Sequence, residues 1–427
     1  MTEDNGTADG SGDPGESPPT SRSPEPLDLQ QQRERLAVQV NIILQGVSGA
    51  AVHPADSLDN MQFHYQQDRI LVRDEDLARV RAVVPGEVVD PLVNGLNVFA
   101  PKNVAALDAL DELDSVLGVG VATPDHIFHV ASPIASCCPA TEPDPVVSAV
   151  PDPPVANDPA VGRGALVAVV DTGYIPSLDD PAHNWLAGVT GDDEHYDPND
   201  IGPYVGHGTF VAGVVRSMAP GAEVRVEGLL TQGGAVTESE ILRGLTKAMD
   251  LMPDVISMSA GCTTRHNLPP LAFEVLWERR LRHYKGTVLV VAAGNSATRQ
   301  PFWPAAYEWT VSVGALDRFG DRAWFSNFGS WVDVYALGVD MVNAHPNGTY
   351  HYREPPRIGE TSEFSNGMAR WSGTSFSTPV VSGMIAARMS RTGHSARHAA
   401  DDILRIAQAN ATPGVGPIAD PSLTFSP

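Results

Sequence analysis

Hydrophobic and polar positions divide the chain into four stretches. Residues 1–35 hold few large apolar side chains among Gly, Ser, Pro, Asp and Glu, so they cannot bury enough surface to offset chain entropy. We expect this stretch to be a disordered acidic tail. Residues 36–130 and 163–427 carry the apolar periodicities of folded domains, and the proline-dense residues 131–162 between them predict a linker without regular structure.

The first patterned stretch predicts a small α+β domain. Its expected elements are a strand at 69–72, a helix at 75–84, a hairpin at 88–100 turning near Asn94-Gly95, a helix at 103–117 and a strand at 118–130. Strand, helix, two strands, helix and strand form the split βαβ arrangement of ferredoxin-like domains.

The second patterned stretch predicts a doubly wound, mostly parallel α/β sheet. Short runs rich in Val, Ile and Leu alternate with longer segments of helical periodicity, as expected when strands are covered on both faces. The expected strands are 165–170, 223–230, 254–258 and 287–293, and the expected covering helices are 238–252 and 271–284.

Charge and composition limit the classes of partner and the compartment that we expect for this protein. The chain has 52 Asp and Glu against 28 Lys and Arg, a formal net charge of −24, which disfavours nucleic acid as a partner. Neither a membrane anchor nor a secretory signal is expected, because no apolar run approaches 20 residues and the N-terminus lacks a basic region followed by an apolar one. The odd set of three cysteines, Cys137, Cys138 and Cys262, suits free thiols in a reducing cytoplasm. Export by a route without a cleaved signal stays open, as does a pairing of Cys262 with Cys137 or Cys138.

Three segments supply candidate catalytic chemistry. Asp171 ends an expected strand, His207 begins a helical pattern, and Ser375 lies in a loop that feeds an expected helix at 380–389. Alone, each is typical of a structural role: a turn or cap, a helix start, and an N-cap. Together they carry more weight, because a serine alcohol needs an imidazole to take its proton, and the imidazole needs a carboxylate to orient it.

The order Asp, His, Ser and the flanking residues resemble the subtilisin-like serine proteases of peptidase family S8. The resemblance is carried by Asp171-Thr172-Gly173, by His207-Gly208-Thr209 and by Gly373-Thr374-Ser375 with Thr378-Pro379, and it spans roughly residues 165–389. It implies a catalytic triad of Asp171, His207 and Ser375.

The resemblance also implies the remaining parts of such a site. Asn295, in Ala292-Ala293-Gly294-Asn295, matches the residue whose side-chain amide stabilises the oxyanion, with the backbone N–H of Ser375 as second donor. Ser259, Ala260 and Gly261 match the segment that pairs with bound peptide.

No cofactor is expected. The helix after His207 runs almost directly into the next strand, where many subtilisin-like proteases carry a longer calcium-binding loop. The acidic residues Asp192, Asp193, Glu194, Asp197, Asn199 and Asp200 have the oxygen ligands that calcium prefers, but a solvated loop is the simpler interpretation. Residues 343–371 resemble an insertion and suggest a hairpin beside the nucleophile.

These features favour a serine endopeptidase that cleaves peptides or proteins and is made as a self-inhibited precursor. Residues 36–130 stand where subtilisin-like zymogens carry a propeptide, so this domain would act as an intramolecular inhibitor, with processing expected within about 130–158. An unrelated accessory domain is the alternative for this stretch. For the whole chain, the alternatives are an inactive protease fold that binds peptides or regulates a partner, and a peptide-joining transpeptidase.

Overall fold

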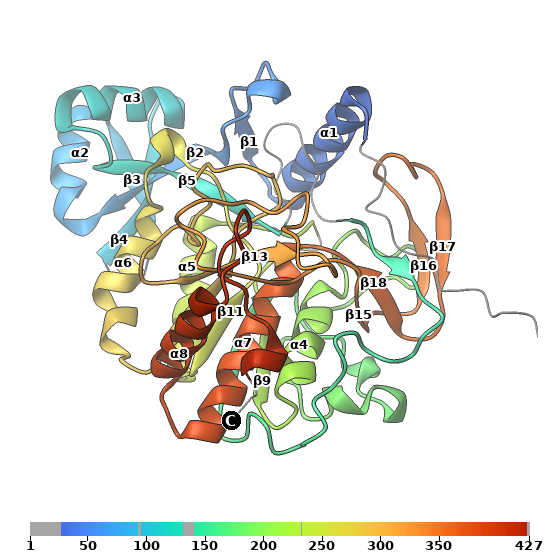
Figure 1. Cartoon of the computed structure of the whole chain (residues 1–427). Coiled ribbons are helices and arrows are strands. Elements are labelled where there is room, and N and C mark those ends of the chain that lie inside the picture. The colour runs from blue at the N-terminus through green and yellow to red at the C-terminus, as the bar shows by residue number, and fades with distance from the viewer. Residues whose placement is uncertain (1–26, 93–94, 131–140, 232, 425–427) are drawn as a thin grey trace, which may run out of the picture.

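The computed structural model describes residues 27–92, 95–130, 141–231 and 233–424, which form an N-terminal α+β domain docked on a larger α/β domain (Figure 1). In the larger domain, a seven-stranded sheet has the order β14-β13-β12-β11-β7-β9-β8. All its pairs are parallel. The strands are β7 (Leu166–Asp171), β8 (Thr190–Gly191), β9 (Glu223–Gly228), β11 (Val255–Met258), β12 (Val288–Ala292), β13 (Val311–Leu316) and β14 (Val334–Leu337).

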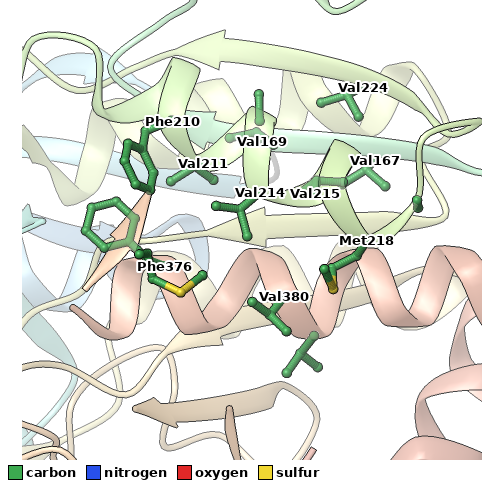
Figure 2. Close-up of a cluster of buried hydrophobic side chains, with 14 of the residues drawn as sticks. Val167, Val169, Phe210, Val211, Val214, Val215, Met218, Val224, Phe376 and Val380 are labelled. Carbon is green, nitrogen blue, oxygen red and sulfur yellow. The ribbon is translucent and has the colours of Figure 1, made fainter. Parts of the chain in front are cut away.

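Helices cover both faces of this sheet, as the near-continuous apolar strands predict. The helices are α4 (His207–Met218), α5 (Glu238–Asp250), α6 (Leu271–Arg279), α7 (Thr374–Thr392), α8 (Ala396–Ala409) and α9 (Pro421–Thr424). Alternate residues of β7 face opposite layers: Val167 and Val169 pack with α4 and α7, whereas Val170 packs in the cluster that includes α5 and α6. Figure 2 shows the first layer, where Phe210 of α4 and Phe376 of α7 meet above β7.

The N-terminal domain has the predicted ferredoxin-like order. Its elements are β2 (Phe63–Arg73), α2 (Leu77–Val83), β3 (Gly86–Pro91), β4 (Leu96–Pro101), α3 (Ala106–Leu117) and β5 (Ala122–His129). The strands form an antiparallel sheet in the order β5-β2-β4-β3, and β1 (Ala50–His53) pairs with β2 outside that path. One face of this sheet packs on α2 and α3. The turn expected at Asn94-Gly95 lies partly outside the described residues.

The opposite face of the N-terminal sheet covers helices α5 and α6. Phe128 of β5 stacks on Phe273 of α6, with ring centroids 5.2 Å apart. At its edge, β5 pairs antiparallel with β10 (Ala235–Thr237) of the larger domain. The two domains therefore share a sheet edge and an apolar layer.

The expected boundary of the N-terminal tail at residue 35 is wrong. Helix α1 spans Leu29–Gly46, and Asp28 caps it: its Oδ1 accepts from the Gln31 backbone N–H at 2.8 Å while the Gln31 side chain accepts from the Asp28 N–H. Leu29–Arg35 thus belong to an ordered helix, because a capping box and the buried residues beyond it outweigh the polar composition of its first turns. Residues 1–26 lie outside the described residues.

The linker expected at 131–162 is also only partly correct. Residues 131–140 lie outside the described residues, but β6 (Asp144–Pro145) pairs with β18, and Ala156 N–H donates to Ser217 O at 2.8 Å. Prolines are tolerated here because β6 is an edge strand.

The segment at 343–371 forms an arm of two nested antiparallel pairs rather than one simple hairpin. Its strands are β15 (Met341–Ala344), β16 (Gly348–His351), β17 (Thr361–Phe364) and β18 (Met368–Trp371); β15 pairs with β18, and β16 with β17. In Figure 1 this arm stands beside α1. The described chain also contains short 3₁₀ turns at Leu58–Asn60, Asp74–Asp76, Pro176–Leu178, Pro181–Leu186, Arg265–Asn267 and Leu281–His283. In the part of the chain that the structure describes, no helix is both long enough and apolar enough to cross a bilayer.

Candidate active site

Asp171 and His207 meet at the carboxyl edge of the parallel sheet. Asp171 is the last residue of β7 and His207 the first residue of α4. The Asp171 Oδ1 atom is hydrogen-bonded to His207 Nδ1 at 2.7 Å and accepts from Thr172 N–H at 2.8 Å. Both side chains are buried. This contact orients the imidazole and leaves Nε2 as the nitrogen available for proton transfer.

Two glycines allow this close approach. Gly206, before His207, has φ +81°, and a Cβ there would lie 2.4 Å from Pro346 of the arm. At Gly208, a Cβ would lie 2.3 Å from the Gly173 carbonyl oxygen. A larger residue at position 208 would separate α4 from the end of β7, and one at position 206 would collide with the arm.

Ser375 lies in the first turn of α7, not in a loop before a helix at 380–389, because the helix already begins at Thr374. Pro379 has no N–H to bond the carbonyl of Ser375 four residues earlier, so that carbonyl accepts from Ser259 Oγ at 3.0 Å instead. The proline that interrupts the helical ladder therefore frees the carbonyl of Ser375 for a contact with the neighbouring segment.

Asn295 is hydrogen-bonded to Thr374, the residue before Ser375. Its Oδ1 accepts from the N–H and the hydroxyl of Thr374, at 2.9 and 2.8 Å. The amide oxygen is thus occupied on the Ser375 side, which leaves the amide N–H group to act as a donor. This arrangement is compatible with the expected oxyanion role of Asn295, which stays a prediction.

Aromatic rings surround His207 near Ser375. The His207 ring lies 5.3 Å from Trp371 and 5.2 Å from Phe376, centroid to centroid. Trp371 ends strand β18 of the arm, and Phe376 directly follows Ser375. The arm thus reaches the candidate site through Trp371.

The expected peptide-pairing segment is paired with this chain's own N-terminal domain. Gly261 and His129 exchange both backbone hydrogen bonds, at 3.0 and 3.1 Å, in antiparallel orientation. On the other side, Val130 N–H donates to Gly234 O at 2.9 Å. The end of β5 therefore lies between two strands, one leading from Ser259 and Ala260 to Gly261, the other beginning at β10. Strand β10 was not predicted, because three residues carry too little pattern.

The acidic residues considered as calcium ligands point to different partners. Asp192 contacts Lys247 at 3.3 Å, Asp200 pairs with Arg353, and Asp197 accepts from the backbone and side chain of Asn199. Within the described residues, no three His, Cys, Asp or Glu side chains gather as metal ligands. Glu194 is the exception in this loop, since it is buried.

Cys262 follows the peptide-pairing segment and is a free, buried thiol. Burial raises its pKa well above the ordinary value, so it stays protonated and is a poor nucleophile. Cys137 and Cys138 lie outside the described residues.

Comparison with known proteins places this arrangement in a family. The Subtilase family model, Peptidase_S8, matches residues 162–415. The chain belongs to the subtilase family. The predicted resemblance and the subtilisin-like α/β fold are therefore confirmed.

Among the relatives of this subtilase, a thermophilic serine proteinase from Bacillus sp. (strain AK1) is 33% identical over 233 residues, covering 52% of this chain and 51% of the relative. Thermitase from Thermoactinomyces vulgaris is 32% identical over 255 residues, covering 57% of this chain and 81% of thermitase. The chain thus spans about half the length of the Bacillus relative. The crystal structure of fervidolysin from Fervidobacterium pennivorans, described as a keratinolytic enzyme related to subtilisin, aligns with a TM-score of 0.56 at 19% identity. That alignment covers 85% of this chain and 61% of fervidolysin, and it supports the shared fold.

Proposed function

We propose that this subtilase is a serine endopeptidase whose triad is Asp171, His207 and Ser375. The observation that carries the proposal is the 2.7 Å contact between Asp171 and the Nδ1 atom of His207, with the ring of Phe376, next to Ser375, against that imidazole. The chemical types of the three groups support the proposal, because acyl transfer needs a nucleophile, a base and a carboxylate that orients the base.

In the proposed reaction, Ser375 Oγ attacks the carbonyl carbon of the scissile peptide bond while His207 Nε2 takes its proton. The C–N bond then breaks as His207 protonates the leaving amine, and water hydrolyses the acyl-enzyme by the same proton route. Asp171 stabilises the imidazolium. The amide N–H of Asn295 and the N–H of Ser375 would stabilise the oxyanion, where removal of one such donor costs about 10²- to 10³-fold in turnover in a subtilisin.

The test compares two serines of the same helix turn. Ser375→Ala should abolish peptide hydrolysis and labelling by a fluorophosphonate probe while leaving the circular dichroism spectrum and Tm unchanged. Ser377→Ala is the matched control, because Ser377 is equally buried and its Oγ has no hydrogen-bond partner. Full turnover by Ser375→Ala would end the triad assignment, and no turnover by any variant would favour a peptide-binding protein. Transfer of the acyl group to an added amine in place of water would favour the transpeptidase.

We further propose that the N-terminal domain is an intramolecular inhibitor. Support comes from the end of β5, which occupies the position between Gly261 and Gly234 where a substrate strand would pair. Gly261 is two residues from Ser259, whose hydroxyl donates to the Ser375 carbonyl oxygen at 3.0 Å, so the end of β5 pairs with a segment that contacts the proposed nucleophile.

Helix α1 adds a second attachment for this N-terminal region. Arg35 pairs with Glu354 of the arm at 2.5 Å, and Tyr204, three residues before His207, donates its hydroxyl to the Gln39 side chain at 2.6 Å. All four side chains are buried or half-buried. The inhibitor would thus be held by both the substrate groove and the arm.

The same contacts narrow the expected processing site. The chain is bonded in the groove up to Val130, and from Thr141 onward it is bonded to the larger domain: Thr141 O accepts from Trp371 Nε1, and β6 pairs with β18. Within the expected window to residue 158, Pro143 and Pro151 are buried, whereas Val147 and Val150 are exposed. We expect cleavage within residues 131–140, ahead of the first of these contacts with the larger domain.

Processing is tested by N-terminal sequencing of the fragments. Wild-type protein should yield a new terminus within 131–140, and Ser375→Ala should remain whole. Intact wild-type protein with full peptidase activity would refute the inhibitor proposal without affecting the triad. Cleavage that persists in Ser375→Ala would point to another protease.

A further inference from the structure

Glu194 links the two segments that carry the candidate acid and base. It lies on the loop after β8 and is only 6% exposed. Its Oε2 accepts from Gly206 N–H at 3.0 Å and from the Thr172 hydroxyl at 3.1 Å. Gly206 directly precedes His207, and Thr172 directly follows Asp171. One carboxyl oxygen thus joins the end of β7 to the start of α4.

The link continues to the reacting groups. The Thr172 hydroxyl oxygen accepts from Gly208 N–H at 3.1 Å, just after His207. The Thr172 backbone N–H donates to the same Asp171 oxygen that bonds His207. Thr172 therefore connects Glu194 to both Asp171 and His207. A movement of Thr172 would change the geometry of the Asp171–His207 hydrogen bond.

The surroundings of Glu194 hold it as a neutral acid near pH 7. Burial, with a further contribution from the charge of Asp171, raises the pKa of Glu194 to about 8. His345 of the arm lies against Gly206 and is also neutral, because burial lowers its pKa to about 3. The backbone carbonyl of Tyr174 accepts from the Glu194 N–H, and the pKa of the Tyr174 hydroxyl is raised to about 12, chiefly by burial. Asp192 on the same loop is paired with Lys247.

A neutral carboxyl suits this place. An ionised Glu194 would add a second negative charge close to Asp171 in a buried site, where like charges repel strongly. A neutral acid keeps both hydrogen bonds to Oε2 without that repulsion. The rest of the acidic loop is mostly exposed, so burial and contacts single out Glu194.

We propose that Glu194 is a positioning residue, which sets the Asp171–His207 geometry through the Thr172 hydroxyl and the Gly206 N–H. This inference rests on the proposed triad. It assigns a role to a residue that touches neither the substrate nor Ser375, and it explains why one residue of a polar loop is buried against the start of α4.

The test expresses the full-length chain, allows it to be processed, and compares three variants. Glu194→Ala removes both hydrogen bonds and should lower kcat roughly 10- to 100-fold with little change in KM, because small misplacements of reacting groups reduce turnover. Glu194→Gln keeps an oxygen acceptor and should restore kcat to within about threefold at pH 7. Asp193→Asn is the matched control: it removes a formal charge from the exposed neighbour and should change nothing.

The pH profile separates positioning from general stability. Above about pH 8 the wild-type carboxyl ionises beside Asp171, so kcat should decline there. Glu194→Gln cannot ionise and should lack this decline. Identical alkaline limbs in the two proteins would count against the proposal.

A second readout does not depend on turnover. In a Ser375→Ala background, the low-field proton resonance of His207 Nδ1–H reports the bond to Asp171. It should persist with Glu194→Gln and broaden or vanish with Glu194→Ala. If wild-type protein hydrolyses nothing, the proposed function fails while this resonance still tests the positioning role.

Thr172 supplies a further pair of variants should Glu194→Ala fail to fold. Thr172→Val removes the hydroxyl at nearly the same volume, whereas Thr172→Ser keeps it. We expect Val, but not Ser, to lower kcat and broaden the resonance. Unchanged kcat, KM and resonance in Thr172→Val, or in a folded Glu194→Ala, would overturn the proposal.

Discussion

The interior of the parallel sheet and the surface between the two domains are both buried, but they are built from different groups. Beneath α4 and α7 the sheet presents almost entirely Val and other aliphatic side chains (Figure 2). The interdomain surface has an apolar centre at Phe128 and Phe273, but charged and titratable groups surround it. The apolar side chains of the sheet interior cannot exchange their contacts for hydrogen bonds to water. Many of the groups at the interdomain surface can.

Polar contacts between the domains are numerous and specific. Asp125 accepts from the N–H and hydroxyl of Ser239 at the start of α5, at 2.9 and 2.7 Å. His126 Nδ1 is hydrogen-bonded to Glu238 at 2.7 Å, and Arg265 pairs with Asp111 and Asp114. Burial raises the pKa of Asp125 to about 7. Such groups favour one docked arrangement of the two domains, and the proposed inhibitor role requires that they can also separate.

The largest effect is expected from a charge in the sheet interior. Val290 of β12 is fully buried and lies between Ser257 of β11 and Val311 of β13. Val290→Asp would bury an unpaired carboxyl and should cost about 4 kcal/mol or more, so we expect no folded protein by circular dichroism. A folded variant with wild-type Tm would show that the sheet interior is less tightly packed than its burial indicates.

A smaller and different effect is expected at the interdomain surface. Arg265→Ala leaves Asp114 without its guanidinium partner, and both side chains are only 11% exposed. Docking should weaken by about 2 kcal/mol or more, so fluorophosphonate labelling of the unprocessed chain should accelerate at least tenfold. Arg280→Ala is the matched control, because Arg280 pairs with an exposed Asp250 within the larger domain. Equal labelling rates in the two variants would contradict a separable interdomain surface.

Acidification should weaken the N-terminal domain through His64. Burial lowers the pKa of His64 to about 3, below its ordinary 6.5, so the folded state disfavours the protonated form. The contribution of neutral His64 to the free energy of unfolding is complete above pH 6.5. It is lost as the pH falls toward 3, at about 1.4 kcal/mol per pH unit. The Tm of His64→Gln should therefore rise relative to wild type as pH falls from 6.5 to 4. The difference between the two proteins removes the contributions of Asp125 and Glu354, whose raised pKa values act in the opposite sense, and reports His64 together with its effect on the neighbouring His129. A constant Tm difference across this range would contradict the assignment.

The smallest effect is expected from chelation. The acidic loop is engaged in its own ion pairs and hydrogen bonds, and α4 ends at Met218 shortly before β9 begins at Glu223. EDTA should therefore shift the Tm of either region by no more than about a degree or two. A large decrease that added calcium reverses would show a binding site in this protein.

Local pattern was sufficient to predict much of the molecule. Buried parallel strands need long apolar runs, so β7 and β12 were predicted within about a residue of their observed ends. The candidate triad residues could be proposed from the sequence because they stand beside particular glycines, such as Gly208, which permits the close contact of α4 with β7. Helix α1 was not predicted, because its first turns are polar and its burial depends on the distant Glu354 and Tyr204.

The sequence by itself determined the sheet, the order of the N-terminal elements and the three candidate catalytic groups, because these depend on periodicity and on residue chemistry within short segments. Only the tertiary structure decided which surfaces meet. Glu194 is one acid among several in the printed sequence, and nothing local distinguishes it from Asp193. Folding buries one and exposes the other, because the hydrogen bonds and desolvation that set their roles come from Thr172 and Gly206, segments that reach the loop only in three dimensions.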